Sequence, residues 1–530
     1  MASAAAPSHA WNSERSVAGR NNPWAIVAII SLPTFMEVLD TSIANVSLNE
    51  IAGGLSITLD QATWVLTSYL VANAIIIPIS GWLSDVIGRK RYFMISVALF
   101  TIASFLCGIA PNLQFLVIAR ILQGIGGGGL APVEQSMLAD TFPPEKRGMA
   151  FATFAIVVVV GPVLGPTLGG FITDTASWHW IFLINVPVGI ASLVLTQLFV
   201  DEPQILIDER KARHRRGIRI DYIGFALVAA GLGFLELTLD RGEREAWFDS
   251  SFILTTALVS AVALVGLVAW EWRHKDPIVD IKLFRNRNFA ITNLIMFTTG
   301  MILFGTTQLI PQMLQQVLGY SATDAGLALT VGGIATLLAV PIAGRLTDKV
   351  DVRMLLFPAL IVQGLALYNL SLLNSHIAFM DAAVARMYQS VALPFLFVPI
   401  NAAAYVGLPQ RATAQASSLL NVSRNLGGTV GISAAQTLLA NYRQVEQSRL
   451  VEGLNPLNPN YVEWMNRAAA MVGESMEARM AVLYQIVQQQ AAMLSFLDTF
   501  HTFMLFVFVV SPVALFLKSK RGAKAPAGAH

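Results

Sequence analysis

Residues 81–90 read Gly-Trp-Leu-Ser-Asp-Val-Ile-Gly-Arg-Lys and form a short polar interruption between two long apolar blocks. A degraded copy, Gly-Arg-Leu-Thr-Asp-Lys-Val-Asp-Val-Arg, occupies residues 344–353. A second match lies near each copy, because Arg-Ile-Leu-Gln at 120–123 returns as Arg-Met-Tyr-Gln at 386–389. The two offsets, 263 and 266 residues, are nearly equal. The chain therefore carries an internal repeat of about half its length.

This repeat predicts how the chain is divided. We expect a cytoplasmic tail (1–23), a first six-helix bundle (24–200), an inserted two-helix linker (201–289), a second six-helix bundle (290–518) and a second cytoplasmic tail (519–530). Parallel repeats of helices with a binding site between them are an architecture of membrane transporters.

The composition is that of a membrane protein. Hydrophobic residues make up 55% of the chain and charged residues only 13%, whereas soluble domains contain about 25% charged residues. A spanning helix needs about 20 consecutive apolar residues, while a barrel strand would show alternation over about ten. We therefore expect an all-α membrane protein with fourteen spanning helices, at 24–46, 62–82, 92–110, 113–138, 149–171, 180–200, 221–240, 251–272, 290–311, 323–343, 353–373, 379–405, 413–438 and 497–518.

Positive charge marks the predicted cytoplasmic side. Lysine and arginine gather in every second loop, for example at 89–91, 146–147 and 273–287, and most of the other loops contain almost none. Because cytoplasmic loops are enriched in these residues, both termini should lie in the cytoplasm. The longest outer loop, 439–496, is either a solvated hairpin without a specific role or an element for docking or gating.

Several functions are disfavoured by the motifs that the sequence lacks. The single cysteine, Cys107, allows no intramolecular disulfide, and no Cys/His spacing indicates a metal site. The glycine run at 126–129 is not followed by Gly-Lys-Ser/Thr, so it is not a nucleotide-binding loop. The sequence also contains no His-Glu-x-x-His motif. We therefore expect neither an ATP-driven pump nor a membrane enzyme, no metal or other cofactor, and no nucleic-acid partner.

Four stretches make the chain similar to the major facilitator superfamily, in its fourteen-helix drug:proton antiporter branch. They are 39–46 (Leu-Asp-Thr-Ser-Ile-Ala-Asn-Val), 81–90, 161–170 (Gly-Pro-Val-Leu-Gly-Pro-Thr-Leu-Gly-Gly) and 178–187 (Trp-His-Trp-Ile-Phe-Leu-Ile-Asn-Val-Pro). The resemblance implies proton-driven export of hydrophobic or amphiphilic drugs from a bacterial inner membrane by alternating access. The segment at 455–459 resembles the inner-membrane subunits of tripartite pumps, which implies a periplasmic adaptor and an outer-membrane channel as partners.

The resemblance assigns a cytoplasmic gate to the first copy of the repeated motif. Gly81 and Gly88 permit a close helix approach and a tight turn. Asp85 and Arg89 make charge contacts there, and the family's partner for the arginine maps onto Asp140. The alternative is that the positive charges only anchor the loop at the membrane surface.

Residues 161–170 match the pattern that marks antiporters in this family. Prolines remove backbone donors and bend a helix, and glycines let it pack closely on a neighbour. The resemblance implies that this helix seals the interface between the halves against leakage, and the alternative is an ordinary packing kink. The residues of the pattern are Gly161, Pro162, Gly165, Pro166, Gly169 and Gly170.

Charged residues inside the predicted helices need a reason, because a charge at mid-bilayer costs at least about 2.5–3.5 kcal/mol. Asp40 lies roughly 24 Å along the first helix at 1.5 Å per residue, and Glu37 is on the same face. Arg120 must pair with an acid or line a wet cavity. The resemblance assigns proton coupling to Asp40 and places Arg120 beside the proton site, with Asp40 or Glu37 as its partner. Since Glu37 departs from the family pattern, either acid could carry the proton, and a structural role is the alternative for each.

Other polar residues within the predicted spans are weaker candidates. We expect Glu134 and Glu236 near the membrane surface. A transporter of one physiological metabolite or siderophore is the alternative function on the same fold, and the antiporter pattern argues against uptake. The residues expected to line the substrate cavity are Asn45, Gln123, Gln308, Gln312, Arg386 and Arg424.

Overall fold

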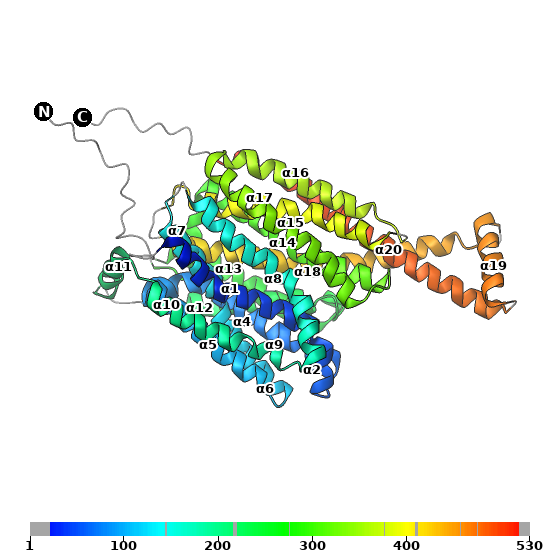
Figure 1. The fold of residues 1–530 in the computed structure, drawn as a ribbon, viewed down its shortest axis with the longest axis horizontal. Coiled ribbons are helices and arrows are strands. Elements are labelled where there is room, and N and C mark those ends of the chain that lie inside the picture. Colours follow the sequence, from blue (N-terminus) through cyan, green and yellow to red (C-terminus); the bar gives the residue numbers. More distant parts are fainter. Residues whose placement is uncertain are drawn as a thin grey trace.

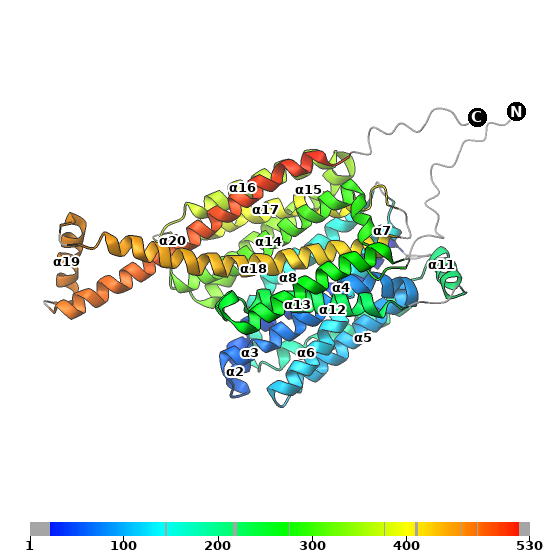
Figure 2. The same ribbon diagram turned by 180° about the vertical axis from the view of Figure 1, so that it is seen from behind.

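Helices make up all the regular structure in the part of the chain that the computed structural model describes, and they form an elongated bundle (Figure 1). An arm built from α18, α19 and α20 projects from one end of this bundle (Figures 1 and 2). The described residues are 22–143, 146–215, 220–274, 276–375, 377–408, 412–455, 457–473 and 475–518.

The first half of the chain forms one group of packed helices. One predicted span, 113–138, is two helices, because the chain turns at Gly128 and Gly129. A Cβ atom on Gly128 would lie 2.8 Å from the backbone oxygen of Asn73, so the break lies where two helices approach closely. The elements are α1 (Pro23–Val46), α2 (Leu48–Gly54), α3 (Leu59–Ala62), α4 (Trp64–Ile87), α5 (Arg89–Gly108), α6 (Leu113–Gly127), α7 (Leu130–Thr141), α8 (Arg147–Thr175), α9 (Trp180–Leu183) and α10 (Asn185–Phe199).

An inserted segment connects the halves. Its long helices α12 and α13 pack on each other, and α12 also contacts α4 of the first half and α18 of the second (Figure 2). The elements are α11 (Gln204–Arg215), α12 (Tyr222–Arg241), η2 (Trp247–Asp249), α13 (Ser251–Arg273) and η3 (Ile281–Arg285).

The second half contains the projecting arm, from which its last long helix, α20, returns to the bundle (Figure 2). The outer loop expected at 439–496 is mostly helical, because α18 continues well past its predicted end and α20 begins far before its predicted start. The elements are α14 (Arg287–Gln316), α15 (Ala322–Lys349), α16 (Val352–Ser371), α17 (Phe379–Ala404), α18 (Thr413–Glu452), α19 (Pro459–Val472), α20 (Met476–Val510) and η5 (Ser511–Phe516).

Twelve helices of the described chain are long and apolar enough to cross a membrane, and α8 makes thirteen if its two parts, bent by 46°, count as one span. Helix α18 does not meet this criterion, although it lies within the bundle. Its buried side chains include Gln415, Asn421 and Arg424, which lower its apolar content. The count of fourteen spans and the cytoplasmic position of both termini therefore stay predictions.

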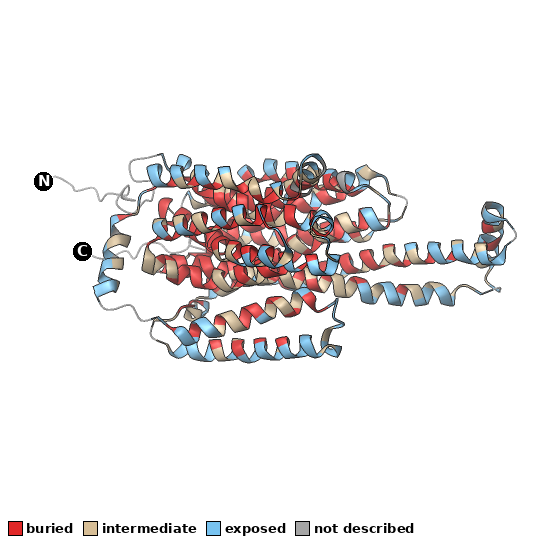
Figure 3. Cartoon of the chain, turned by 90° about the horizontal axis from the view of Figure 1, so that it is seen from below, coloured by how far each residue is buried: buried red, intermediate tan, exposed pale blue. Residues whose placement is uncertain are grey.

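Both copies of the repeated motif lie where the two halves touch. A Cβ on Gly81 would stand 3.0 Å from the backbone oxygen of Ala414, and one on Gly344 would stand 3.0 Å from Cβ of Ala152. The backbone N–H of Gly148 donates to Oδ1 of Asp348 over 2.8 Å. The halves are thus in contact at the end of the bundle that carries the motifs, and buried residues concentrate in the centre of the bundle rather than in the arm (Figure 3).

Candidate functional site

A buried ion pair joins α1 to α6. Nη1 of Arg120 donates to Oδ2 of Asp40 over 2.6 Å, and neither side chain is exposed to solvent. The Nε–H of Arg120 donates to the backbone oxygen of Val65 over 3.0 Å. The other terminal nitrogen of Arg120, Nη2, is buried without a hydrogen-bond partner in the described chain. The resemblance implied Asp40 or Glu37 as the partner of Arg120, and the structure pairs Arg120 with Asp40.

Amide and hydroxyl groups complete the surroundings of Asp40. Its Oδ1 accepts hydrogen bonds from Nε2 of Gln123 over 2.9 Å and from Nδ2 of Asn185 over 2.8 Å. The amide of Gln123 also donates to Oγ of Ser104, and its oxygen accepts from Arg120 over 2.8 Å. Asp40 is therefore held from two helices in addition to its own, α6 and α10, which is what a buried charge requires.

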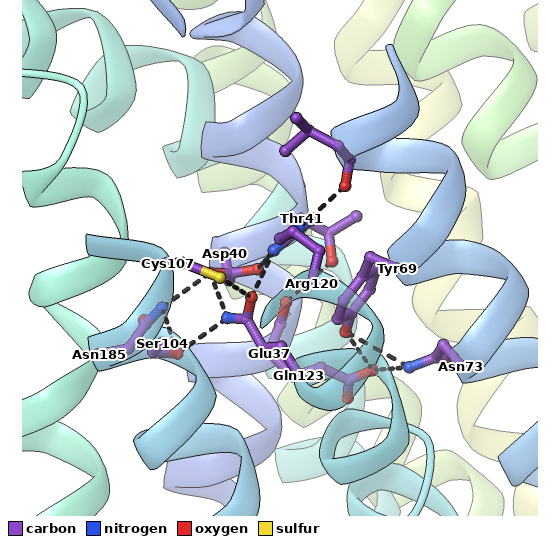
Figure 4. Close-up of polar contacts among 11 residues, drawn as sticks. Glu37, Asp40, Thr41, Tyr69, Asn73, Ser104, Cys107, Arg120, Gln123 and Asn185 are labelled. Carbon is purple, nitrogen blue, oxygen red and sulfur yellow. Dashed lines mark hydrogen bonds and ion pairs between the residues drawn. The ribbon is translucent and has the colours of Figure 1, made fainter. Parts of the chain in front are cut away.

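Tyr69 connects this ion pair to Glu37 (Figure 4). The guanidinium carbon of Arg120 lies 4.4 Å from the centre of the Tyr69 ring, a cation–π contact. The hydroxyl of Tyr69 donates to Oε1 of Glu37 over 3.3 Å, and Nδ2 of Asn73 donates to the same oxygen over 3.1 Å. The two acids predicted on one face of α1 thus have different partners, since Asp40 pairs with a cation and Glu37 with neutral donors.

A second charged group lies between the halves. Glu37, Glu134 on α7 and Arg424 on α18 lie within electrostatic range of one another. One oxygen of each acid, together with Nε and Nη1 of Arg424, is buried without a hydrogen-bond partner in the described residues. Glu134 is fully buried and accepts a hydrogen bond from Ser31, so it does not face solvent in this structure, and its depth in the membrane stays a prediction. The sequence did not predict a partner for Arg424, and the structure places two acids within electrostatic range of it.

The second half repeats the arginine–glutamine pair without the acid. Nη1 of Arg386 donates to Oε1 of Gln389 and, over 3.2 Å, to Oγ1 of Thr306. Nη2 of Arg386 donates to Oγ1 of Thr307 over 3.1 Å. Arg386 is 1% exposed, and no carboxylate of the described chain forms an ion pair with it.

The residues assigned to the cytoplasmic gate lie at the junction of α4, α5 and α7. Arg89 and Asp140 form a buried ion pair between α5 and α7. Gly88 has φ +105°, a conformation that favours glycine. The backbone N–H of Arg89 donates to Glu202 over 3.1 Å, which joins the motif to the start of the linker. Asp85 lies in the last turn of α4, on the same motif.

The glycines of the antiporter pattern pack on α1. Added Cβ atoms at Gly161, Gly165 and Gly169 would lie 2.6, 2.1 and 3.1 Å from side chains of α1. Gly170 has no atom within 4 Å of such a Cβ. The backbone oxygen of Pro162 accepts a hydrogen bond from Ser42 over 3.2 Å, two residues after Asp40, and Pro166 lies in the bent stretch of α8. Three of the four glycines thus allow a close approach of α8 to the helix that carries Asp40.

The predicted cavity residues are not gathered in one place. Asn45 is exposed near the end of α1, and Gln312 accepts a hydrogen bond from Gln436 over 3.0 Å within the second half. Gln308 is half-buried on α14. Glu236 on α12, which was expected near the membrane surface, is 3% exposed to solvent, and both of its oxygens accept from Thr429 of α18 over 3.0 and 3.1 Å.

Some site residues were missed by sequence reasoning. Asn185 lies in a stretch that was singled out, 178–187, yet nothing in its spacing indicated that it would reach Asp40. Tyr69 and Ser104 give no sequence signal beyond being polar groups in apolar helices. A rule that every polar group inside a span needs a partner would have marked all three.

Comparisons with known proteins agree with this architecture. The family model described as Major Facilitator Superfamily matches residues 30–432. The multidrug export protein EmrB of Haemophilus influenzae is 41% identical over 431 residues, which cover 81% of this chain and 83% of that protein. The fatty acid resistance protein FarB of Neisseria gonorrhoeae is 38% identical over 437 residues, covering 82% and 84%.

Solved structures share the fold at low sequence identity. The proton:xylose symporter XylE aligns with a TM-score of 0.59 and 14% identity, covering 95% of this chain and 97% of that one. The human organic anion transporter MFSD10 aligns with a TM-score of 0.56 and 12% identity, covering 92% and 100%.

Proposed function

Because the chain belongs to the major facilitator superfamily and is an EmrB-like multidrug transporter, we propose that it exports hydrophobic and amphiphilic drugs in exchange for protons. Transport proceeds by alternating access, in which the two halves move about a central site. The buried Asp40–Arg120 pair carries the proposal, because a protein rarely holds such charges inside a membrane without using them.

Asp40 is the proton carrier in this proposal. A proton on Asp40 removes its charge, so the ion pair with Arg120 is lost and the buried guanidinium needs a new partner. The hydrogen bonds from Gln123 and Asn185 bind the charged carboxylate best, so they weaken at the same time. Protonation thereby changes the balance between two arrangements of α1 and α6, which a proton gradient can drive.

Glu37 transmits this change to the second half. It shares Tyr69 with Arg120 on one side and lies within electrostatic range of Arg424 of α18 on the other. Asn73, which donates to Glu37, also accepts a hydrogen bond from Asn425 of α18 over 3.3 Å. A rearrangement at Asp40 therefore reaches α18 through contacts that cross between the halves.

Arg386 is suited to bind the negative group of an acidic amphiphile. Its charge is compensated by the hydroxyls of Thr306 and Thr307 and by Gln389 rather than by a carboxylate. A buried guanidinium of this kind pairs strongly with a ligand carboxylate once the cavity opens. One relative, FarB, is named for resistance to fatty acids, which are acidic amphiphiles.

The topology in this proposal has fourteen spans, with both termini in the cytoplasm of a bacterium and the transporter in its inner membrane. Helices α8 and α18 are the two additional spans, since both pack within the bundle. The two six-helix halves, 24–200 and 290–518, move relative to each other, and 201–289 connects them. Cysteine labelling at Ser56 and Arg345, on opposite predicted sides, tests this orientation.

The arm of α18, α19 and α20 is the proposed docking site for an EmrA-type periplasmic adaptor, which leads to a TolC-type outer-membrane channel. Apolar side chains are exposed on it, among them Leu457, Trp464 and Tyr484, and exposed apolar patches mark interaction sites. Photo-crosslinking from position 464 should capture a co-expressed adaptor. Crosslinking from position 262, an exposed valine on α13, is the control, and equal capture from both positions would count against docking at the arm.

Drug-triggered proton movement in proteoliposomes tests the function as a whole. Chemically different hydrophobic drugs should each release a trapped pH gradient when the wild-type protein is present. A transporter of one metabolite or siderophore would respond to a single compound class instead. Reconstitution without the adaptor separates transport across one membrane from assembly of the larger pump.

A further inference from the structure

A third polar cluster lies at the ends of the inserted helices, away from Asp40. Asp221 caps the start of α12, Glu271 lies in the last turn of α13, and His274 caps the end of α13. One oxygen or nitrogen atom of each side chain lies within 4.8 Å of those of the other two. The cluster contains the imidazole and carboxylate ligands that transition-metal ions accept.

The cluster contains more negative charge than its described surroundings balance. Asp221 is 5% exposed and Glu271 is 1% exposed. Oε2 of Glu271 and Nδ1 of His274 are buried without a hydrogen-bond partner in the described residues. Lys282 donates to the backbone oxygen of His274 over 3.0 Å rather than to a carboxylate. Two neighbouring buried carboxylates repel each other unless a cation or a proton lies between them.

Each ligand candidate is already oriented by its neighbours. Oδ1 of Asp221 accepts from the backbone N–H of Gly224 over 2.8 Å, and both of its oxygens accept from Nε1 of Trp270 over 3.0 and 2.9 Å. The Trp270 ring also stacks on His274, with centroids 6.0 Å apart. Oε1 of Glu271 accepts from the backbone N–H of Val279 over 3.4 Å, which leaves Oε2 free. Outer contacts of this kind fix ligands in metal sites.

We propose that Asp221, Glu271 and His274 bind a divalent transition cation, with Zn²⁺ as the test ion. Nδ1 of His274 lies 3.4 Å from Oδ2 of Asp221 and has no hydrogen-bond partner in the described residues. This distance between the two atoms equals the spacing of about 3.4 Å between neighbouring ligand atoms around a tetrahedral Zn²⁺ ion with bonds of about 2.1 Å. A small rotation of the free Glu271 carboxylate brings the third ligand into place.

A cation at this position fastens the start of α12 to the end of α13. The linker helix α11 is also tied to this region, because Arg213 of α11 pairs over 2.8 Å with Asp276, two residues after His274. Because both helices would supply its ligands, the bound ion would hold the start of α12 against the end of α13. The inserted helices would then stay together while the halves move. This role is separate from proton coupling, so it can fail while the proposed function stands.

The test is metal binding by the full-length, tag-free protein in detergent. After chelator treatment and dialysis against Zn²⁺, mass spectrometry of the metal content should find about one equivalent per chain. Glu271→Gln and His274→Ala should each weaken binding at least about tenfold. The same variants should lose the rise in melting temperature that Zn²⁺ gives the wild type, because a ligand stabilises only the state that binds it.

Two control variants lie outside the cluster. Asp276→Asn and His214→Ala remove an acid and a histidine that do not belong to it and should keep wild-type binding. Glu271→Gln changes no side-chain volume and so keeps the test valid if His274→Ala does not fold. The proposal is overturned if the wild type binds no Zn²⁺, or if Glu271→Gln binds it as tightly as Asp276→Asn does.

Discussion

Thr306 occupies in the second half the place that Asp40 occupies in the first. The two residues are 266 positions apart, the same offset that separates Arg120 from Arg386. Asp40 accepts from Arg120 over 2.6 Å, and Thr306 accepts from Arg386 over 3.2 Å. Both halves therefore contain the buried arginine, but among the described residues only the first half contains an acid paired with it. In the proposed mechanism, this difference separates a proton-binding half from a half whose positive charge is available to a ligand.

Thr306→Asp should supply the missing acid and pair with Arg386. If Arg386 binds acidic amphiphiles, their affinity should fall about tenfold, or roughly 1.4 kcal/mol, while that of cationic drugs stays close to the wild-type value. Ligand-induced tryptophan fluorescence quenching would measure both classes. Thr306→Asn is the uncharged control. An equal loss for acidic and cationic ligands would contradict the role given to Arg386.

Asn185→Ala should weaken transport without abolishing it. The change removes one of the donors to Asp40, and the loss of a buried hydrogen bond costs about 1–3 kcal/mol. We expect a lower melting temperature and roughly tenfold slower drug-coupled proton flux. Asn45→Ala is the matched control, because Asn45 is exposed on the same helix as Asp40. If the control slows transport equally, Asn45 belongs to the substrate path, as the sequence predicted.

Gly165→Ala should disturb the contact between α8 and α1, because the new Cβ would lie 2.1 Å from Oγ of Ser42. Overpacking of this kind costs about 1–3 kcal/mol. We also expect a faster passive proton leak in liposomes without drug. Gly170→Ala adds the same methyl group where nothing lies within 4 Å and should behave as wild type. A Gly165→Ala variant with no more proton leak than the wild type would refute the sealing role of α8.

Arg89→Gln and Asp140→Asn should each destabilise the closed gate. Removing one member of a buried ion pair leaves an unpaired charge and costs about 3–5 kcal/mol. We expect faster labelling of a cysteine that replaces Ser84, which is 1% exposed near the end of α4. Removing both charges together should restore part of the protection, whereas Arg91→Gln, at an exposed position of α5, should have no effect. Additive effects of the two changes would show that the residues act independently.

The fold and part of the site could be predicted from sequence because their signals are local. The motif at 81–90 and its copy indicated the family, which the family match confirms. Asp40 and Arg120 were recognisable because a charge inside an apolar helix needs a partner. The extent of α18 was not predictable from apolar blocks, since its buried face is polar and its outer part leaves the bundle.

Contacts between distant residues could not be predicted in this way. Asn185 reaches Asp40, and Glu236 reaches Thr429, only because α10 and α12 pack where they do. Asp221 and His274 are more than 50 residues apart, so no metal-ligand spacing appears in the sequence. These pairs depend on how the helices are arranged in space, and a single sequence carries no record of that arrangement.

The most direct test of the central claim compares wild type with Asp40→Asn in proteoliposomes, measuring drug binding and drug-triggered proton flux on the same preparation. The substitution keeps the shape of the side chain and removes its charge. We expect binding to survive and proton flux to disappear, with Glu37→Gln retaining part of the flux. If Asp40→Asn still moves protons in response to drug, another acid carries them and the account of the Asp40–Arg120 pair is wrong.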